Sequence, residues 1–191
     1  MTLTHILPSL RRTLPDPLDR DSWPEFTTTS PTDITIAGLS LVTLVGWCGT
    51  PCVHTAAAVV PGTNGRPSES KLASVVVTRV TSVSFENDQL IVWVDAELDR
   101  CDAICSQARL IGRASTAHAT SATLFPASPH ATVHRALELP VDLMEGDLIA
   151  IPCRGVTLLR EVQNRAIHPE RLSDDRVEHE RDQFPLPTCG R

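Results

Sequence analysis

The sequence predicts a mainly β protein: a single antiparallel β-barrel or sandwich with one or two short helices. Between residues 74 and 162, short apolar segments follow one another closely and are broken by Pro and Gly turns instead of helices. Aromatic residues make up only 4% of the chain and Tyr is absent, so Val, Leu, Ile and Ala must fill the core. Such β-branched filling favours strands. A chain of 191 residues fits one core with tails.

The chain divides into three predicted parts. Residues 1–31 contain five prolines, which repeatedly remove backbone donors, and we expect a Pro-rich N-terminal arm outside the core. Residues 32–166 form the β-barrel domain. Residues 167–191 are mostly charged, and the apolar pattern stops before them, so we expect a C-terminal tail.

We expect a soluble, cytoplasmic protein that does not contact a membrane. The sequence contains no run of roughly 18 apolar residues, the length that a membrane helix needs. The N-terminus also lacks the basic start and the small-residue cleavage site of a secretory signal. The six cysteines are too sparse for the disulfide framework of a small secreted domain.

Within the domain, the apolar pattern predicts a short strand at Ile34 and Ile36 and then a helix over residues 39–45. A Gly-Thr-Pro turn at residues 49–51 leads to a second strand. Residues 74–85 and 89–98 predict a β-hairpin, because three polar residues separate two strongly β-prone segments. Residues 98–107 predict a helical turn. Further short strands are expected within residues 108–115, 122–127, 133–140 and 147–162.

The second hairpin strand has a clear register. Leu90, Val92, Val94 and Ala96 share one wholly apolar face, which we expect to be the core face. Ile91, Trp93, Asp95 and Glu97 share the other face, where the two carboxylates are expected at a solvated edge. In the first hairpin strand, residues 75–83, neither face is uniformly apolar.

The charged residues argue against two classes of function. The chain has 17 basic and 23 acidic residues, a net charge of −6, and Lys71 is its single lysine. Nucleic-acid binding is disfavoured because it needs a clustered basic surface. Schiff-base chemistry is disfavoured because only one lysine is available for it.

Four segments follow one another in a recognisable order. They are residues 34–54 with the turn Gly49-Thr50-Pro51, the segment VVPGTNGR, the hairpin, and the Gly146-Asp147 turn. This order resembles the pyridoxal-phosphate-dependent amino-acid decarboxylases of the diaminopimelate and ornithine type, which share the alanine-racemase-like fold, and VVPGTNGR is similar to that family's Glu-Pro-Gly-Arg signature. The resemblance covers roughly residues 33–160 and implies the family's β-domain, of the decarboxylase C-terminal type, with the α/β barrel deleted near residues 56–70. A convergent β-barrel with the same turns is the alternative.

The chain departs from the family at the positions that hold the cofactor. The barrel lysine has no counterpart, and the glutamate that pairs with the pyridinium nitrogen falls at Val60, although Pro61 and Gly62 remain and Arg66 is displaced. The family's active-site cysteine falls at Ser115, and the tyrosine beside the cofactor phosphate falls at Val156. The resemblance therefore implies a relative that holds no pyridoxal phosphate, and we expect no cofactor.

Two functions follow from this resemblance. The first is a non-catalytic, pseudoenzyme-like module that dimerises or assists another protein, such as a biosynthetic enzyme, because a barrel-less β-domain leaves apolar surface to cover. The expected partner is a second copy or a different protein. The second is a small cofactor-independent enzyme of specialised metabolism with a pocket in the β-barrel. Ser115, Thr116, His118 and Arg154 are its candidate pocket residues, with Arg154 pairing with a small organic acid. No catalytic residue is assigned, and the sequence leaves open whether the protein is an enzyme.

The cysteines are weak candidates for a metal or redox site. Cys48 and Cys52 are separated by three residues, and so are Cys101 and Cys105. Four thiolates can complete a tetrahedral zinc site, but structural zinc pairs more often have two intervening residues. A redox dithiol at Cys48 and Cys52 is a further alternative. We expect free thiols and no metal.

Overall fold

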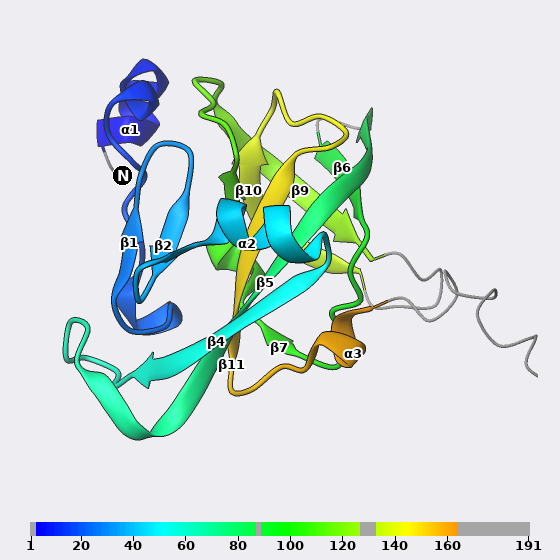
Figure 1. Ribbon diagram of the computed structural model, residues 1–191. Helices are drawn as coiled ribbons and strands as arrows, with labels where there is room; N and C mark the ends of the chain where they lie inside the picture. The colour runs from blue at the N-terminus through cyan, green and yellow to red at the C-terminus, as the bar shows by residue number, and fades with distance from the viewer. Residues whose placement is uncertain (1–2, 87–88, 127–132, 164–191) are drawn as a thin grey trace, which may run out of the picture.

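The computed structural model describes residues 3–86, 89–126 and 133–163 and has the mainly β fold that the sequence predicts (Figure 1). The predicted C-terminal tail, residues 167–191, lies outside the described residues. Within those ranges, every helix falls short of the length and apolar character needed to cross a membrane.

The helices and strands alternate irregularly along the chain. The N-terminal elements are α1 (Leu3–Ile6), η1 (Pro8–Arg12), η2 (Arg20–Ser22), β1 (Thr27–Thr29), β2 (Ile34–Ile36), β3 (Leu39–Ser40) and α2 (Leu41–Cys48). They are followed by β4 (Cys52–Val59), β5 (Pro67–Glu86), β6 (Gln89–Val94), β7 (Asp102–Ala103), η3 (Cys105–Gln107) and β8 (Arg109–Ile111). The last elements are β9 (Ala119–Phe125), β10 (His134–Pro140), β11 (Leu148–Arg154) and α3 (Leu159–Val162).

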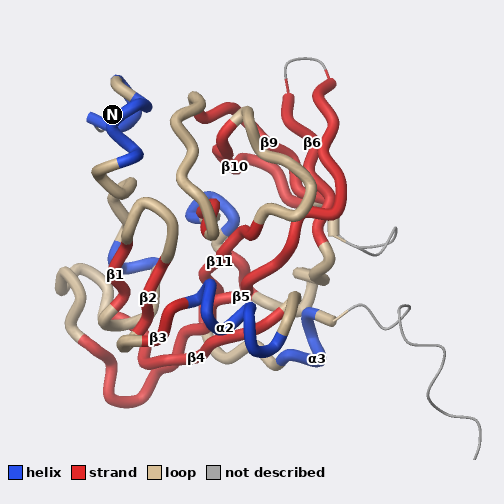
Figure 2. The backbone as a smooth tube through the Cα atoms, turned by 45° about the horizontal axis from the view of Figure 1, so that its top comes forward, coloured by secondary structure: helices blue, strands red, loops and turns tan. Residues whose placement is uncertain are grey.

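The larger sheet is organised around the long strand β5. Among the described residues its order is β10-β9-β6-β5-β11-β7, with β4 also paired to β5 and β8 to β11. The pairs are antiparallel except for β6 with β9, which is parallel. The sheet curls into a half-barrel (Figure 1). Strands β1–β3 form a separate small sheet, which Figure 2 shows on the opposite side of the molecule from β6 and β9.

The centre of β5 is buried on both of its faces. Val76 and Val80 belong to the larger core cluster, whereas Val75 and Val77 belong to a second cluster. Side chains therefore face a core whichever way they point, and this explains why the sequence shows no uniformly apolar face here.

Strand β6 confirms the predicted register. Leu90, Val92, Val94 and Ala96 are all at most 2% exposed and lie in the larger core cluster. Ile91 and Trp93 on the other face are only half-buried, and the Trp93 ring stacks on Phe125 of β9. The alternation of β6 arises because only one of its faces meets a core.

Asp95 differs from the sequence expectation of a solvated edge. Its Oδ1 accepts hydrogen bonds from Thr78 Oγ1 (2.7 Å) and Arg79 N (2.9 Å), and its Oδ2 accepts one from Thr50 Oγ1 (2.6 Å). Asp95 therefore joins the end of β6 and the start of β4 to the same stretch of β5. The alternation of apolar and polar residues in the sequence correctly places Asp95 on the outer face but does not predict these hydrogen-bond partners.

The predicted N-terminal arm contributes to the fold, which the sequence did not indicate. Trp23 is 1% exposed and packs in the second core cluster with Ile36 and Leu41. Strand β1 pairs with β2, with Thr29 opposite Ile34. An indole buried from a Pro-rich segment is invisible to strand or helix periodicity, because this segment has neither.

The remaining predicted elements are mostly confirmed. The expected helix after Ile36 is α2, whose first turn is capped by the Ser40 hydroxyl accepting from Thr43 N (3.0 Å). The expected short strands are β8, β9, β10 and β11. The helical turn expected over residues 98–107 is wrong in part, because this segment forms the short strand β7 and then the single 3-10 turn η3.

Candidate functional site

A pocket of about 310 Å³ lies between the N-terminal segment and the larger sheet. Residues 15–18, the β1–β2 turn, and the segment from η3 into β8 line it together with β10. The volume is at the lower end of the range for small-molecule sites. Its titratable and hydroxyl-bearing lining residues are Arg11, Asp16, Asp33, Glu138, Arg109, Arg113, Thr29, Ser30, Ser106 and Ser115.

Ser115, a sequence candidate, lines this pocket, and its hydroxyl is already engaged. Its Oγ donates to Asp142 Oδ1 (2.6 Å) and accepts from Ala117 N (3.1 Å). Asp142 Oδ2 also pairs with Arg113 Nη1 at 3.3 Å. Ser115 therefore fixes the loop after β8 against the turn before β11.

Arg113 is held by the same turn. Its Nε and Nη2 donate to the two carboxylate oxygens of Asp147, each at 2.7 Å. The hydrogen bond to Asp147 raises the pKa of Arg113 above its usual value, against a smaller opposing effect of burial. This bidentate pair is of the strong, orienting kind, so Arg113 is a structural cation in this wall of the pocket.

Arg109 is a pocket cation whose hydrogen bonding is incomplete. Its Nη1 donates to Ala108 O (3.0 Å), its Nη2 reaches Pro17 O at 3.4 Å, and its Nε has no partner among the described residues. Burial lowers its pKa, although Asp16 and Glu138 act in the opposite direction. Neighbouring Arg11 pairs with Asp16 through Nε and Oδ2 at 3.2 Å.

The sequence did not single out Arg11, Asp16 or Arg109. Arg11 and Asp16 lie in the segment that was expected to be an arm, and Arg109 lies in a strand of three residues. The one sequence feature that could have indicated buried cations is the predominance of arginine over lysine, because arginine is more readily buried than lysine.

The four sequence candidates for the pocket are not brought to one place. Ser115, Thr116 and His118 share the loop between β8 and β9, and His118 is exposed. Arg154 ends β11, four residues beyond Ala150, which lies opposite Arg109, and Arg154 is absent from the pocket lining. Arg154 is also exposed, and within the described part of the chain it pairs with Asp102 at 3.5 Å.

The cysteines group differently from the sequence candidates. Cys52 is buried in the second core cluster, and Cys48 is exposed at the end of α2. Cys101 and Cys105 instead pack against the larger core cluster, to which Cys153 belongs. Across the described ranges, no group of three or more metal-ligating side chains has an arrangement that would hold a metal ion.

The single lysine lies apart from the pocket. Lys71 is exposed on the first half of β5, and its backbone N donates to Ser68 Oγ (3.1 Å). It is absent from the pocket lining.

The comparisons with known proteins show a weak similarity of fold. No protein-family model matches the chain, and no curated protein does. Among solved structures, two of arginine decarboxylase from the Paramecium bursaria Chlorella virus, one of them bound to agmatine, match with 13% sequence identity and a TM-score of 0.35. The match covers 48% of this chain and 28% of the decarboxylase chain. The chain therefore matches less than a third of the length of the decarboxylase chain.

Proposed function

We propose that this protein is a non-catalytic interaction module that associates with a second copy of itself through the free edge of β4. The observation that carries the proposal is the unprotected character of this edge. Strand β4 forms its ladder with β5, and among the described residues its other edge is bridged only near its end, where Ala58 meets Pro24 and Glu25 N donates to Ala57 O (2.8 Å).

The sequence of β4, CVHTAAAV, has no feature that blocks another strand. Exposed edge strands of monomeric proteins usually carry charged residues, Pro or a bulge that prevent pairing with another chain. Strand β4 has no charged residue and no Pro, and its register shift falls only at Ala57–Val59.

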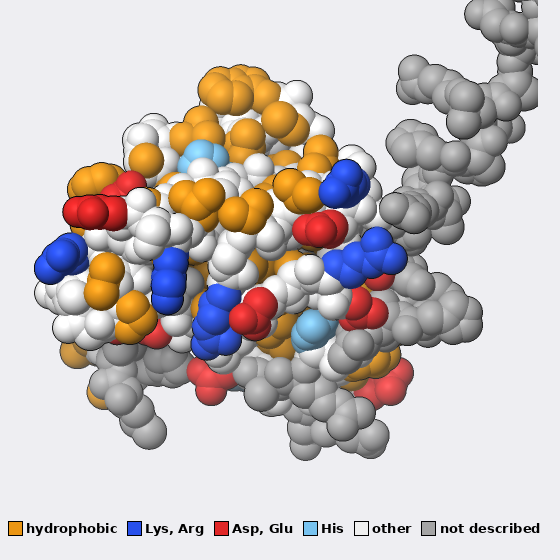
Figure 3. Space-filling view, turned by 90° about the horizontal axis from the view of Figure 1, so that it is seen from below, with side chains coloured by type: hydrophobic (Ala, Val, Ile, Leu, Met, Phe, Trp, Pro, Cys, Tyr) orange, Lys and Arg blue, Asp and Glu red, His pale blue; other side chains and the backbone are white. Residues whose placement is uncertain are grey.

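Two exposed apolar side chains lie close to β4. Trp47, at the end of α2, is 72% exposed, and Leu72, opposite Ala57 in the β4–β5 pair, is 48% exposed. Figure 3 shows the molecule from below, the side of β4 and the first half of β5 in Figure 1, with hydrophobic side chains across the face and charged ones set between them.

A second copy is the partner that fits this edge best. Two identical strands can pair in antiparallel fashion around a two-fold axis, because the same edge of each copy then faces the other. Such a pair needs no different partner protein with a complementary edge. Because the chain carries a net charge of −6, two copies repel each other over most of their surfaces. Contact through the uncharged β4 places no like charges directly opposite each other.

Light scattering of the purified chain tests this proposal. We expect a mass of twice 20.8 kDa at high concentration. The double variant Trp47→Lys/Leu72→Lys should be monomeric and keep the circular dichroism of the parent, since both side chains are exposed. Met144→Lys, an equally apolar and exposed position in the turn before β11, is the matched control and should stay dimeric.

Two results would contradict the proposal. A parent protein that is monomeric at every concentration excludes self-association, and pull-down of a different protein through β4 would then identify an accessory role. A dimer that persists in the double variant but dissociates in the control would place the interface elsewhere.

The alternative function, a small cofactor-independent enzyme, has one observation in its favour. Ser115 lines the 310 Å³ pocket together with Arg109, whose guanidinium retains an unused donor. As a second proposal, Arg109 takes the place expected of Arg154 and pairs with a small organic acid. Saturation-transfer NMR with benzoate tests it, because Arg109→Gln should abolish the signal whereas Arg154→Gln should leave it unchanged. The opposite pattern, or no signal in the parent, would exclude this site.

A further inference from the structure

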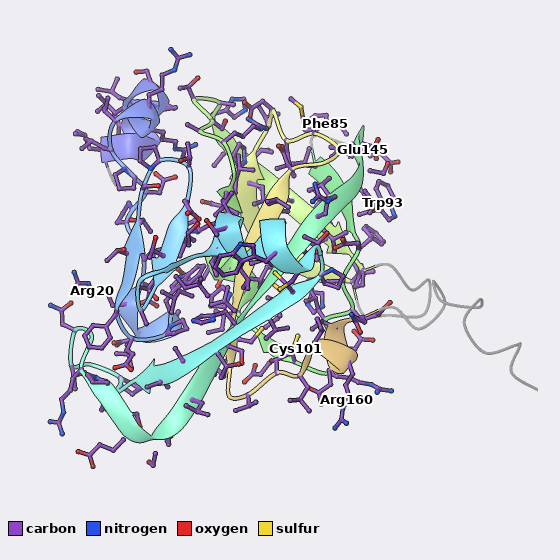
Figure 4. The ribbon with its side chains drawn as sticks, viewed as in Figure 1. Arg20, Phe85, Trp93, Cys101, Glu145 and Arg160 are labelled. Atoms are coloured by element: carbon purple, nitrogen blue, oxygen red, sulfur yellow. The ribbon has the colours of Figure 1, made fainter. Side chains whose placement is uncertain are left out.

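Three thiols from two segments of the chain lie at the larger core cluster. Cys153 is 1% exposed in β11, and half-buried Cys101 and Cys105 pack against its cluster. The pairing of β7 with β11, in which Ala103 lies opposite Cys153, brings the chain around Cys101 to this strand. Figure 4 shows Cys101 next to α3. Cys101 is partly exposed, whereas Cys153 is buried.

We infer that Cys101 and Cys153 form a peroxide-sensitive thiol pair, in which Cys101 is oxidised first and Cys153 then closes a disulfide with it. The inference is independent of the proposed self-association, because both cysteines lie outside β4 and its flanking residues. It assigns a function to a pair that the cysteine spacing did not suggest, since Cys101 was grouped with Cys105, Cys48 and Cys52.

The electrostatics divide the roles between the two sulfur atoms. A hydrogen bond from the Cys153 thiol lowers the pKa of Cys101, and this effect outweighs burial and the nearby carboxylates of Glu161 and Asp102. The same hydrogen bond, together with burial, raises the pKa of Cys153. The thiolate is the reactive form of cysteine, so the half-exposed Cys101 is the attacking group.

Cys105 is the less reactive neighbour. Burial raises its pKa to about 11, and the charge of Cys101 adds to this effect. Cys105 therefore stays protonated under conditions in which Cys101 reacts.

The oxidation is balanced with hydrogen peroxide as the oxidant. The Cys101 thiolate attacks one peroxide oxygen, the O–O bond breaks, and hydroxide leaves and is protonated to water, which gives the sulfenic acid. The Cys153 sulfur, losing its proton, then attacks the Cys101 sulfur. The S–S bond forms, the S–O bond breaks, and the departing hydroxide takes up that proton as a second water. The two thiols supply the two electrons that reduce the peroxide.

Peptide mapping tests the inference on the full chain. Dilute protein is treated with hydrogen peroxide, remaining thiols are alkylated, and the trypsin digest is analysed without reduction. Cleavage after Arg100, Arg109, Arg135 and Arg154 gives residues 101–109, with Cys101 and Cys105, and residues 136–154, with Cys153. We expect these two peptides to be linked, in a protein that runs as a single chain on a non-reducing gel.

Variants identify the linked sulfur. Cys105→Ser and the control Cys48→Ser should keep the link between the two peptides, whereas Cys101→Ser should lose it. The inference is overturned if both peptides remain fully alkylated, if the bond forms within residues 101–109, or if the link survives in Cys101→Ser. Should Cys101→Ser fail to fold, fragmentation of the linked peptides from the parent protein still distinguishes Cys101 from Cys105.

Discussion

The two cores of this protein are built from different kinds of sequence. The larger one is formed mainly by strands whose alternation or apolar run can be seen in the sequence, such as β6 and β11. The second one closes β5 from the other side with Trp23, Ile36 and Leu41, which come from a Pro-rich segment, a strand of three residues and a short helix. Strands β5 and β11 belong to both. The difference shows that a strand buried on both faces requires a second layer of side chains on its other face, even where no periodic sequence pattern predicts that layer.

The strongest test of the larger core is a charge on the inner face of β6. Val94→Asp places an unpaired carboxylate at a fully buried position, which costs several kcal/mol and should prevent cooperative folding. Ile91→Asp, on the half-buried outer face, should keep a cooperative thermal transition measured by circular dichroism. A folded Val94→Asp beside an unfolded Ile91→Asp would show that the register of β6 is inverted.

The second core is tested by removing its indole. Trp23→Ala should cost about 3–5 kcal/mol of unfolding free energy, the usual result of emptying a buried aromatic site. Trp47→Ala is the matched control, because this indole is exposed, and its effect should be below about 0.5 kcal/mol. Denaturant unfolding measures both. Equal effects would mean that the N-terminal segment adds nothing to stability.

The junction between the cores depends on Asp95. Asp95→Asn weakens the acceptor of three hydrogen bonds that join β4, β5 and β6, and we expect a loss of roughly 1–3 kcal/mol. Asp102→Asn, at an exposed carboxylate with a 3.5 Å ion pair, should change little. If Asp102→Asn proves the more damaging of the two, Asp95 does not hold the junction.

The smallest expected effect is a pH dependence shared by the two regions. Burial lowers the pKa of His54 in β4 and of His134 in β10 below their usual values. Below pH about 6.5 the unfolded chain therefore binds protons that the folded chain does not, so stability is full above this pH and falls as the pH decreases. The double variant His54→Gln/His134→Gln should flatten this fall in chemical denaturation curves. An unchanged slope would exclude these two histidines as its cause.

The predictability of each region follows from its physics. The register of β6 is readable because one face meets a core and the other does not. The burial of Trp23 cannot be predicted from local sequence, because it depends on the need of β5 for packing partners on its second face. The proximity of Cys153 and Cys101 cannot be predicted either, because it depends on the pairing of β7 with β11. The candidate site was predictable only in part, since Ser115 lines the pocket whereas Arg154 is absent from its lining.

The proposed pairing of β4 with a second copy is tested most directly by hydrogen exchange at several protein concentrations. We predict that those amides of β4 whose N–H points away from β5 exchange slowly in concentrated solution and faster on dilution, because their partner carbonyls belong to the other copy. The amides of β6 and β11 should exchange at the same rate throughout. Concentration-independent exchange in β4, in a sample that light scattering shows to be dimeric, would contradict the account.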